Sequence, residues 1–248
     1  MKFSIIMATY NRAYCIENAI NSVINQTFDK WELIIVDDGS EDNTKEVVKK
    51  YLNEKIKYIK LDKNSGVNVA RNRAIKEAKG EYIVILDTDN MFKNDFLENA
   101  YNIIQKEKFP YMKFLCKNQN NQNISDVFSG YLKYEDFLVE KVKGEFHSVT
   151  KAEFLKNTLF FEDINGGEGI TWKLIAKQTK KVLFVDKISL IYDDSGKDRL
   201  SIKNYNRLYK VFKKDLEVLG SEYWRVSKKY YFLVLAKVLY YKIMSKLK

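Results

Sequence analysis

Cysteine, proline and histidine are scarce in this 248-residue sequence. Its two cysteines, Cys15 and Cys116, lack the spacing of metal ligands, so a cysteine-based zinc site is excluded. So few cysteines are typical of a protein whose thiols stay reduced; a disulfide between Cys15 and Cys116 is the alternative. One proline and ten glycines exclude a linker-rich chain. No apolar run reaches the ~18 residues of a membrane-spanning helix, and residues 1–7 are too short for the core of a signal peptide. We therefore expect a cytoplasmic protein.

Hydrophobic residues make up 46% of the chain and aromatic residues 14%, which is enough for one large domain with a sizeable core. The charge is unevenly distributed. Residues 199–248 hold 13 Lys/Arg and 3 Asp/Glu, which accounts for the whole net charge of +10, so the first 198 residues are neutral. We expect a domain over residues 1–198, followed by a basic helical tail over residues 199–248 that suits an anionic surface.

Short apolar runs alternate with helical periodicity through the first hundred residues. Four of these runs are predicted strands: residues 3–7, 32–36, 56–61 and 82–86. Ser40 is the predicted N-cap of the second helix, and Gly80 is predicted to close the third in the C′ position. The pattern predicts an α/β fold with a central, mostly parallel sheet.

The alternation fades beyond about residue 110. Residues 151–156 and 171–178 are predicted helices, and residues 182–185 a late strand. From residue 201 onward the pattern is helical to the end, with a break expected around Gly220.

Polar clusters follow the ends of three predicted strands, at residues 9–12, 37–40 and 87–90. In parallel sheets the carboxyl ends of the strands meet at one edge, so these clusters are expected to converge on one site. Asp87 and Asp89 there are ligands suited to Mg²⁺ or Mn²⁺ with a bound diphosphate. No G-x-G-x-x-G motif follows the first strand, which argues against a dinucleotide dehydrogenase; the lack of a glycine-rich phosphate loop disfavours a nucleotidyltransferase.

Several motifs also occur in a characteristic order. They are Ile5-Ile6-Met7-Ala8-Thr9-Tyr10-Asn11-Arg12, Gln26-Thr27-Phe28, Val36-Asp37-Asp38-Gly39-Ser40, Asn64-x-Gly66, Ala70-Arg71-Asn72, Gly80-Glu81-Tyr82 and Leu86-Asp87-Thr88-Asp89-Asn90. Together they resemble family 2 glycosyltransferases of the GT-A fold, closely over residues 2–95 and more loosely to about residue 201. The resemblance implies a nucleotide-sugar-binding half over residues 1–110 and an acceptor-binding half over residues 111–198.

The resemblance also implies individual roles. It assigns contacts with the nucleotide-sugar to Thr9, Tyr10, Arg12, Asp38, Arg71, Asp87 and Thr88. Asp38 would accept from the base, which favours uracil, and Arg71 would approach the diphosphate. Asp89 would ligate the metal, Mn²⁺ or Mg²⁺. Thr9 could instead satisfy backbone groups at the strand end.

An inverting transfer needs a carboxylate that takes the proton of the acceptor hydroxyl. In the resembled family it comes from a Gly-Glu-Asp-like segment at the start of a helix, whose counterpart here is residues 166–172. Gly169 stands where the catalytic Asp is common, so Glu168 is the predicted base; it could instead only favour the start of the following helix. Glu162 and Asp163 are the next candidates, and without any base the chain would be an inactive relative.

The segment after the late strand departs from the family because it has no histidine between residues 192 and 201. Asp193 or Asp194 could replace that ligand at the metal, and Lys197 or Arg199 could hold phosphate; a solvated charged loop is the alternative. His147 is the single histidine of the chain and is interpreted as structural.

Residues 221–248 form a basic amphipathic pattern. Arg225, Lys228, Lys229, Lys242 and Lys246 fall on one side of a helical wheel, and Lys237 lies opposite. The pattern favours peripheral contact with the inner face of the membrane near a lipid-linked acceptor. The alternatives are a helical hairpin packed on the domain or a homodimer contact. No motif supports nucleic-acid binding.

The expected function is a metal-dependent inverting glycosyltransferase. It would move a sugar from a UDP-sugar to a hydroxyl of a glycan or glycolipid, in surface polysaccharide or lipopolysaccharide-type assembly. The alternative is an inactive homologue that only binds the nucleotide-sugar.

Overall fold

A computed structural model describes residues 1–193 and 204–247 of the chain. The first hundred residues alternate strands and helices as predicted. The elements in order are β1 (Phe3–Thr9), α1 (Ile16–Ile24), β2 (Trp31–Asp37), α2 (Thr44–Lys49), β3 (Ile56–Lys60), α3 (Val67–Glu77), β4 (Tyr82–Ile85), β5 (Met91–Phe92) and α4 (Phe96–Glu107).

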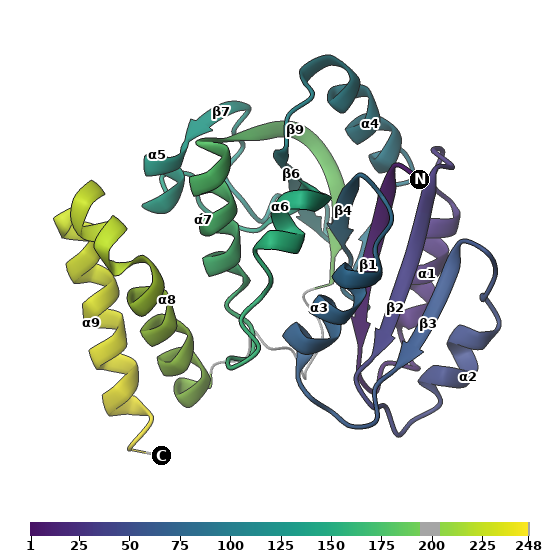
Figure 1. The fold of residues 1–248 in the computed structure, drawn as a ribbon, viewed down its shortest axis with the longest axis horizontal. Coiled ribbons are helices and arrows are strands. Elements are labelled where there is room, and N and C mark those ends of the chain that lie inside the picture. The colour runs from purple at the N-terminus through teal and green to yellow at the C-terminus, as the bar shows by residue number, and fades with distance from the viewer. Residues whose placement is uncertain (194–203, 248) are drawn as a thin grey trace.

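The second half continues the same sheet and ends in helices (Figure 1). Its elements are β6 (Tyr111–Asn118), β7 (Gly130–Lys133), α5 (Tyr134–Leu138), β8 (Phe146–Lys151), α6 (Ala152–Asn157), α7 (Glu168–Thr179), β9 (Lys181–Tyr192), α8 (Tyr205–Val226) and α9 (Lys228–Met244).

The strands form one sheet in the order β3-β2-β1-β4-β8-β6-β9-β5, with β7 paired to β9. The four strands β3, β2, β1 and β4 are parallel, as predicted. Strand β8 runs antiparallel to both β4 and β6, so β6 again runs in the direction of β4. The α/β fold class is confirmed, and the sheet is parallel in its first half and mixed in its second.

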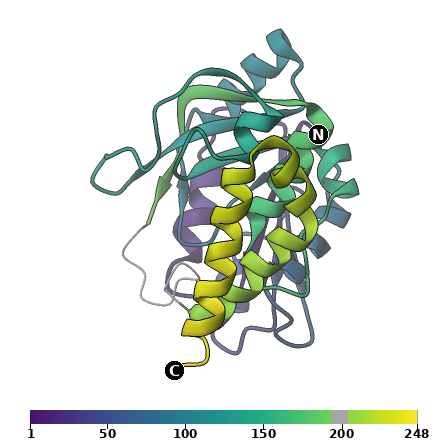
Figure 2. The same cartoon turned by 90° about the vertical axis from the view of Figure 1, so that its left-hand side faces the viewer.

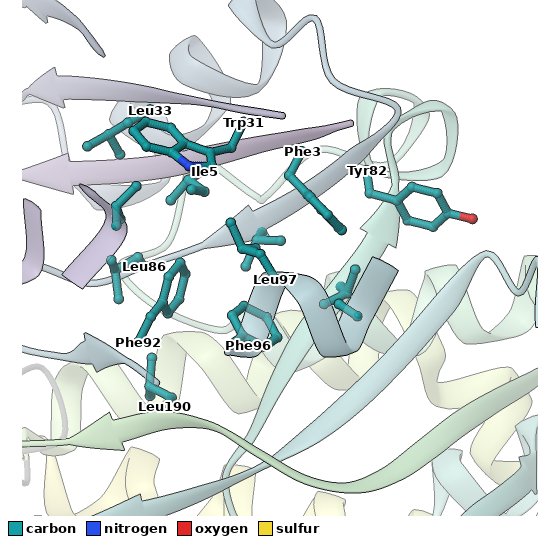
Figure 3. Packing of buried hydrophobic residues seen from close by; sticks show 14 of the residues in the cluster. Phe3, Ile5, Trp31, Leu33, Tyr82, Leu86, Phe92, Phe96, Leu97 and Leu190 are labelled. Atoms are coloured by element: carbon teal, nitrogen blue, oxygen red, sulfur yellow. The ribbon is translucent and has the colours of Figure 1, made fainter. Parts of the chain in front are cut away.

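Each face of the sheet buries its own core (Figure 1). On one face, α1, α2 and α4 cover the side chains of Phe3, Ile5 and Leu33; Figure 3 shows this cluster with Phe96 and Leu97 of α4 packed into it. On the other face lie α3, α5, α6, α7 and α8. Burying one such side chain contributes about 1.5–3 kcal/mol, so these two cores fix the layers.

The predictions for two helix ends were wrong. Ser40 does not cap α2, which begins after Asn43; instead its hydroxyl accepts a 2.8 Å hydrogen bond from the backbone N–H of Asn11. Gly80 does not close α3 either, because α3 ends at Glu77 and the next residue, Ala78, is already in extended conformation. Gly80 is needed for close approach to β1: a Cβ at this position would lie 2.5 Å from the backbone nitrogen of Ser4.

The tail is a helical hairpin whose two helices lie side by side (Figure 2). The predicted break near Gly220 was wrong, because Gly220 is buried inside α8 where Tyr231 of α9 packs against it. The chain turns at Ser227, whose side chain accepts from the N–H of Tyr230 and caps α9. No helix in the described ranges combines the length and apolar content needed to cross a bilayer.

A polar cluster around the buried Lys173 fastens the hairpin to the domain. Lys173 of α7 donates to Glu140 at 3.0 Å and to the hydroxyl of Tyr223 at 3.1 Å, and Tyr223 in turn donates to Asp215 at 2.7 Å. Burial raises the pKa of Asp215, although Lys173 opposes the shift. Of the alternatives for the tail, packing on the domain is therefore present in the structure.

Candidate active site

A cleft of about 1200 Å³ opens at the carboxyl ends of the parallel strands. It is lined by every residue predicted to contact the nucleotide-sugar, and also by Asp89 and Glu168: Thr9, Tyr10, Arg12, Asp38, Arg71, Asp87, Thr88, Asp89 and Glu168. The fold thus brings together residues separated by up to 159 positions in the sequence. Strands β1, β2 and β4 are parallel, so the residues that follow them lie at one edge of the sheet.

The loop after β1 is tied to the loop after β2. Asn11 adopts a left-handed backbone, with φ of 52°, and its side-chain oxygen accepts from the N–H of Glu41 at 2.8 Å. The N–H of Arg12 donates to the hydroxyl of Thr44 at 3.0 Å. The hydroxyl of Thr9 is buried and has no partner among the residues described, so it does not satisfy the strand end as the alternative proposed.

Asp38 anchors the loop that leads into α3. Its carboxylate accepts from the N–H of Ser65 at 2.8 Å and from the N–H of Gly66 at 2.7 Å. Burial raises the pKa of Asp38, and these two hydrogen bonds oppose the shift. Its neighbour Asp37 instead stabilises the turn, where it accepts from the N–H of Ser40.

Arg71 joins two carboxylates across the cleft. One guanidinium nitrogen lies 2.7 Å from Asp87 and the other 2.5 Å from Glu168. The Arg71 side chain is only 6% exposed. Burial alone would lower the pKa of Arg71, but the attraction of Asp87 and Glu168 outweighs it and raises the pKa above its ordinary value. The diphosphate contact implied by the resemblance stays a prediction; the observed partners are the two carboxylates.

The contacts that position the segment before Glu168 were not predicted from the sequence. The side-chain nitrogen of Asn68, on α3, donates to the carbonyls of Phe161, Ile164 and Gly166. Asn72, one turn later, donates to the carbonyl of Phe160 at 2.8 Å. These bonds fix residues 160–166, the segment that leads into α7 and Glu168.

Glu168 is the first residue of α7, so the predicted placement at a helix start is confirmed. A Cβ at Gly169 would meet nothing within 4 Å, so the position has room for the Asp that the resembled family commonly has. Glu162 and Asp163 do not line the cleft. Glu162 accepts from Asn72 at 2.9 Å, and Asp163 pairs with Lys214 of α8.

The end of β4 forms a tight turn in which the N–H of Asn90 donates to the carbonyl of Asp87 at 3.1 Å. The side chain of Asn90 accepts from the N–H of Asp193 at 3.0 Å, which places Asp193 beside the turn that carries Asp89. Asp194, Lys197 and Arg199 lie outside the described residues.

The described residues contain no group of three or more His, Cys, Asp or Glu side chains placed to hold a metal ion. This donor set still fits Mg²⁺ or Mn²⁺. Such ions bind nucleotides through one or two protein carboxylates, and the remaining ligands are substrate phosphates and water. Asp87 and Asp89 face the cleft and meet that requirement.

His147 is among the residues that line the cleft, and its contacts are those of a structural residue, as interpreted. Its ring is buried beside Phe92 and Phe96, and Nε2 lies 2.7 Å from the carbonyl of Ile85. Burial lowers the pKa of His147 to about 4. The neutral ring therefore donates from Nε2 and holds the end of β4.

The comparisons with known proteins agree with this geometry. The family model described as "Glycosyl transferase family 2" matches residues 4–152. This chain belongs to glycosyltransferase family 2. A Campylobacter jejuni relative, named GalNAc(5)-diNAcBac-PP-undecaprenol beta-1,3-glucosyltransferase, is 32% identical over 230 residues, which cover 88% of this chain and 72% of the relative. Three other curated relatives are matched over 46–49% of their own length.

Solved structures show the same fold at low sequence identity. The glycosyltransferase TarS of Staphylococcus aureus in complex with UDP-GlcNAc has a TM-score of 0.74 at 21% identity, over 96% of this chain and 72% of the other. A mannosyltransferase of Pyrobaculum calidifontis in complex with GDP-Man and Mn²⁺ has a TM-score of 0.65 at 19% identity, over 99% of this chain and 75% of the other. The GT-A fold of this glycosyltransferase is therefore established.

Proposed function

We propose that this glycosyltransferase moves a sugar from a UDP-sugar to a hydroxyl of a lipid-linked glycan, with inversion at the anomeric carbon. The observation that carries the proposal is the chain of contacts from Asp87 through Arg71 to Glu168, which brings a carboxylate from each half of the chain into one cleft. The UDP-GlcNAc complex of the TarS structure supports the donor class. The undecaprenol-linked acceptor in the name of the Campylobacter relative supports the acceptor class.

In the proposed reaction, Thr9, Tyr10 and Asp38 bind the nucleotide, while Asp87 contacts the ribose or the sugar. Oxygen Oε1 of Glu168 meets Arg71, so Oε2 is the oxygen left for the acceptor hydroxyl. Glu168 takes the hydroxyl proton as the acceptor oxygen attacks the anomeric carbon. The bond from that carbon to the diphosphate breaks, and UDP leaves with the electron pair. A single displacement from the opposite side inverts the configuration.

Asp89 would hold a divalent metal, with Asp193 nearby as a second oxygen donor. When bound, Mn²⁺ or Mg²⁺ supplies positive charge that offsets the charge developing on the departing diphosphate. Arg207 of α8 also lines the cleft and is a cation that the sequence did not suggest.

The test is turnover of a panel of UDP-sugars with an undecaprenyl-diphosphate-linked glycan, with Mn²⁺, with Mg²⁺ and after chelation. We expect activity that chelation abolishes, a loss of about 10²-fold or more in Glu168→Gln, and a comparable loss in Asp89→Ala. Activity that survives chelation or Asp89→Ala would remove the metal role. Full activity in Glu168→Gln would remove its role as the base.

A nucleotide-sugar-binding protein without turnover is the second candidate. It is favoured by Gly169, which leaves the common position of the catalytic carboxylate without a side chain. It predicts that UDP raises the melting temperature in Mn²⁺ while no acceptor is glycosylated.

We also propose that α9 lies against the inner face of the membrane. Phe232, Leu239 and Ile243 are more than half exposed along one side of α9, and Lys242 and Lys246 flank them. Lys237, predicted to lie opposite, faces inward over the ring of Phe212. An apolar stripe flanked by lysines is complementary to anionic headgroups.

The membrane test is co-sedimentation with phosphatidylglycerol vesicles and with phosphatidylcholine vesicles. Each basic residue near an anionic surface contributes about 1 kcal/mol, so Lys242→Glu/Lys246→Glu should weaken binding to the anionic vesicles at least about tenfold. The matched control, Lys49→Glu/Lys50→Glu at exposed positions at the end of α2, should not. A dimer in solution that Ile243→Asp dissociates, with no vesicle binding, would identify the stripe as a homodimer contact instead.

A further inference from the structure

Lys113 is a buried lysine on the floor of the cleft that no step above uses. It lies on β6 and is 8% exposed. Within the part of the chain that the structure describes, its ammonium forms no ion pair or hydrogen bond. Burial lowers the pKa of Lys113 to about 8, and Glu145 opposes the shift. A buried ammonium without a counter-ion is unfavourable, so an anion beside it would be stabilised.

The register of the sheet places Lys113 relative to the donor site. Lys113 pairs with Ser148 of β8 and with Phe184 of β9. Extending the pairing of Val84 with Val149 brings Ile85, the last residue of β4, level with Ser148. These residues line the cleft in one row across the sheet. Lys113 is therefore two strand spacings, roughly 10 Å, from the strand that leads to Asp87.

Aromatic rings surround the ammonium on the acceptor side. Its nitrogen lies 5.4 Å from the ring centre of Trp172, 5.8 Å from that of Tyr111 and 6.0 Å from that of Phe137. Trp172 is one helical turn after Glu168 on α7, a rise of roughly 6 Å. An acceptor whose hydroxyl meets Glu168 could therefore reach Lys113 with the same sugar unit or the next one.

Two other lysines line this half of the cleft, but neither is both buried and without an ion pair. Lys173 is paired with Glu140, and Lys143 is exposed at the rim. Cation–π contacts with the rings stabilise the Lys113 ammonium in part, and they leave its hydrogens available to an oxygen anion.

We propose that Lys113 binds an anionic group, a carboxylate or a phosphate, on the acceptor sugar or on the sugar next to it. The proposal rests on the proposed function, because it takes the acceptor to enter between Glu168 and Trp172. It defines the substrate as an acidic glycan and assigns Lys113 as a specificity-determining residue.

The experiment compares three probes that differ at one carbon: methyl glucoside, methyl glucuronide and methyl glucoside 6-phosphate. Their affinities are measured by ligand-observed NMR titration in the presence of UDP and Mn²⁺. A hydrogen bond to a charged group corresponds to a preference of roughly 10–100-fold. We expect the wild type to prefer at least one anionic probe by that factor. A carboxylate preference indicates a uronic acid in the acceptor, and a phosphate preference indicates a phosphorylated sugar.

Lys113→Met keeps an unbranched stem of similar length and should abolish the preference, whereas Lys113→Arg should retain it. Lys117→Met, on the same strand but outside the cleft, is the matched control and should behave as wild type. No preference in the wild type, or one that survives Lys113→Met, would overturn the proposal. UDP affinity is measured in the same samples: failure of the wild type to bind UDP contradicts the proposed function itself, while normal UDP binding without an anion preference contradicts only the role of Lys113.

Discussion

Replacing Arg71 with methionine removes the cation between Asp87 and Glu168 and keeps an apolar stem in the buried position. The guanidinium makes two charge-assisted hydrogen bonds, at 2.7 Å and 2.5 Å. Buried bonds of this kind contribute about 1.5–3 kcal/mol each. Here the carboxylates are 47% and 34% exposed, so water can replace much of the lost interaction. Removing a buried charge also removes its desolvation penalty.

The net effect of Arg71→Met on the free energy of unfolding should therefore be a loss of about 1–2 kcal/mol, or about 2–8 °C in melting temperature for a chain of this size. The effect on catalysis should be larger. Without Arg71, Asp87 and Glu168 repel each other and Glu168 loses its orientation. We expect kcat to fall about 10²-fold, the scale of general base catalysis, while UDP affinity changes less than about threefold.

The assay measures kcat, the KM for the donor and the Kd for UDP in wild type, Arg71→Met, Glu168→Gln and the double variant. If Arg71 acts through Glu168, Arg71→Met should lower kcat by less than about threefold in the Glu168→Gln background, because residues acting as a unit are not additive. An unchanged kcat with UDP binding about tenfold weaker would refute this reasoning. That result would instead support the diphosphate contact that the family resemblance implies.

Three further changes test the surroundings of the site. Asn68→Ala leaves three backbone carbonyls of residues 160–166 without their hydrogen-bond donor. It should lower the free energy of unfolding by about 1–3 kcal/mol, measured by urea unfolding, and should also lower kcat, measured by turnover. His147→Gln should make the free energy of unfolding less sensitive to acid. The pKa of His147 is about 4 in the folded state and about 6.5 in the unfolded state, so this group should cost the wild type about 2 kcal/mol of stability between pH 7.5 and pH 5. A variant that loses as much stability as the wild type would contradict the assignment. Gly169→Asp should leave the melting temperature unchanged or raise it, because the position has room for a side chain and acidic residues stabilise the first turn of a helix; a clear fall would contradict the open space seen there.

The first half of the fold could be predicted because its signal is local. Strands β1, β2 and β4 are largely apolar runs buried on both faces, and each is followed by a polar turn. The polar clusters at the ends of these strands, which contain Thr9, Asp38 and Asp87, were predicted for the same reason, whereas the roles of the individual residues come from the family resemblance. Their convergence needs only parallel pairing, which the alternation of strands and helices implies.

The strands of the second half could not be predicted from local apolar runs, because they carry polar residues at buried positions. In β6 and β8, Lys113 and Ser148 interrupt the apolar pattern, although both are buried once the strands pair. Strand β9 was predicted only over residues 182–185, since the exposed Asp186 and Lys187 end the apolar run. In the structure these two residues are skipped by the pairing: Val185 aligns with Phe114 and Ile188 with Leu115, so the strand bulges and continues to Tyr192.

The prediction of a helix break near Gly220 was wrong because tertiary packing decides the structure there. Glycine in a helix costs only about 1 kcal/mol, which tertiary packing readily exceeds. Here Gly220 is buried where α9 packs against α8, and a Cβ added to it would lie 3.7 Å from the ring of Tyr231, an ordinary contact distance. Such a contact is not visible in the sequence of α8 alone.

Helix α3 explains why the site depends on both halves of the chain. Asn68, Arg71, Asn72 and Ile75 fall within about 100° on one side of the helix, and all four are buried. By hydropathy this side would be assigned to solvent, yet Asn68 and Asn72 bind the backbone of residues 160–166 and Arg71 binds Glu168. The opposite end of the same ion-pair chain is Asp87, at the end of β4. A change in either half that shifts α3 must therefore move the proposed base relative to the donor site, even without touching either carboxylate.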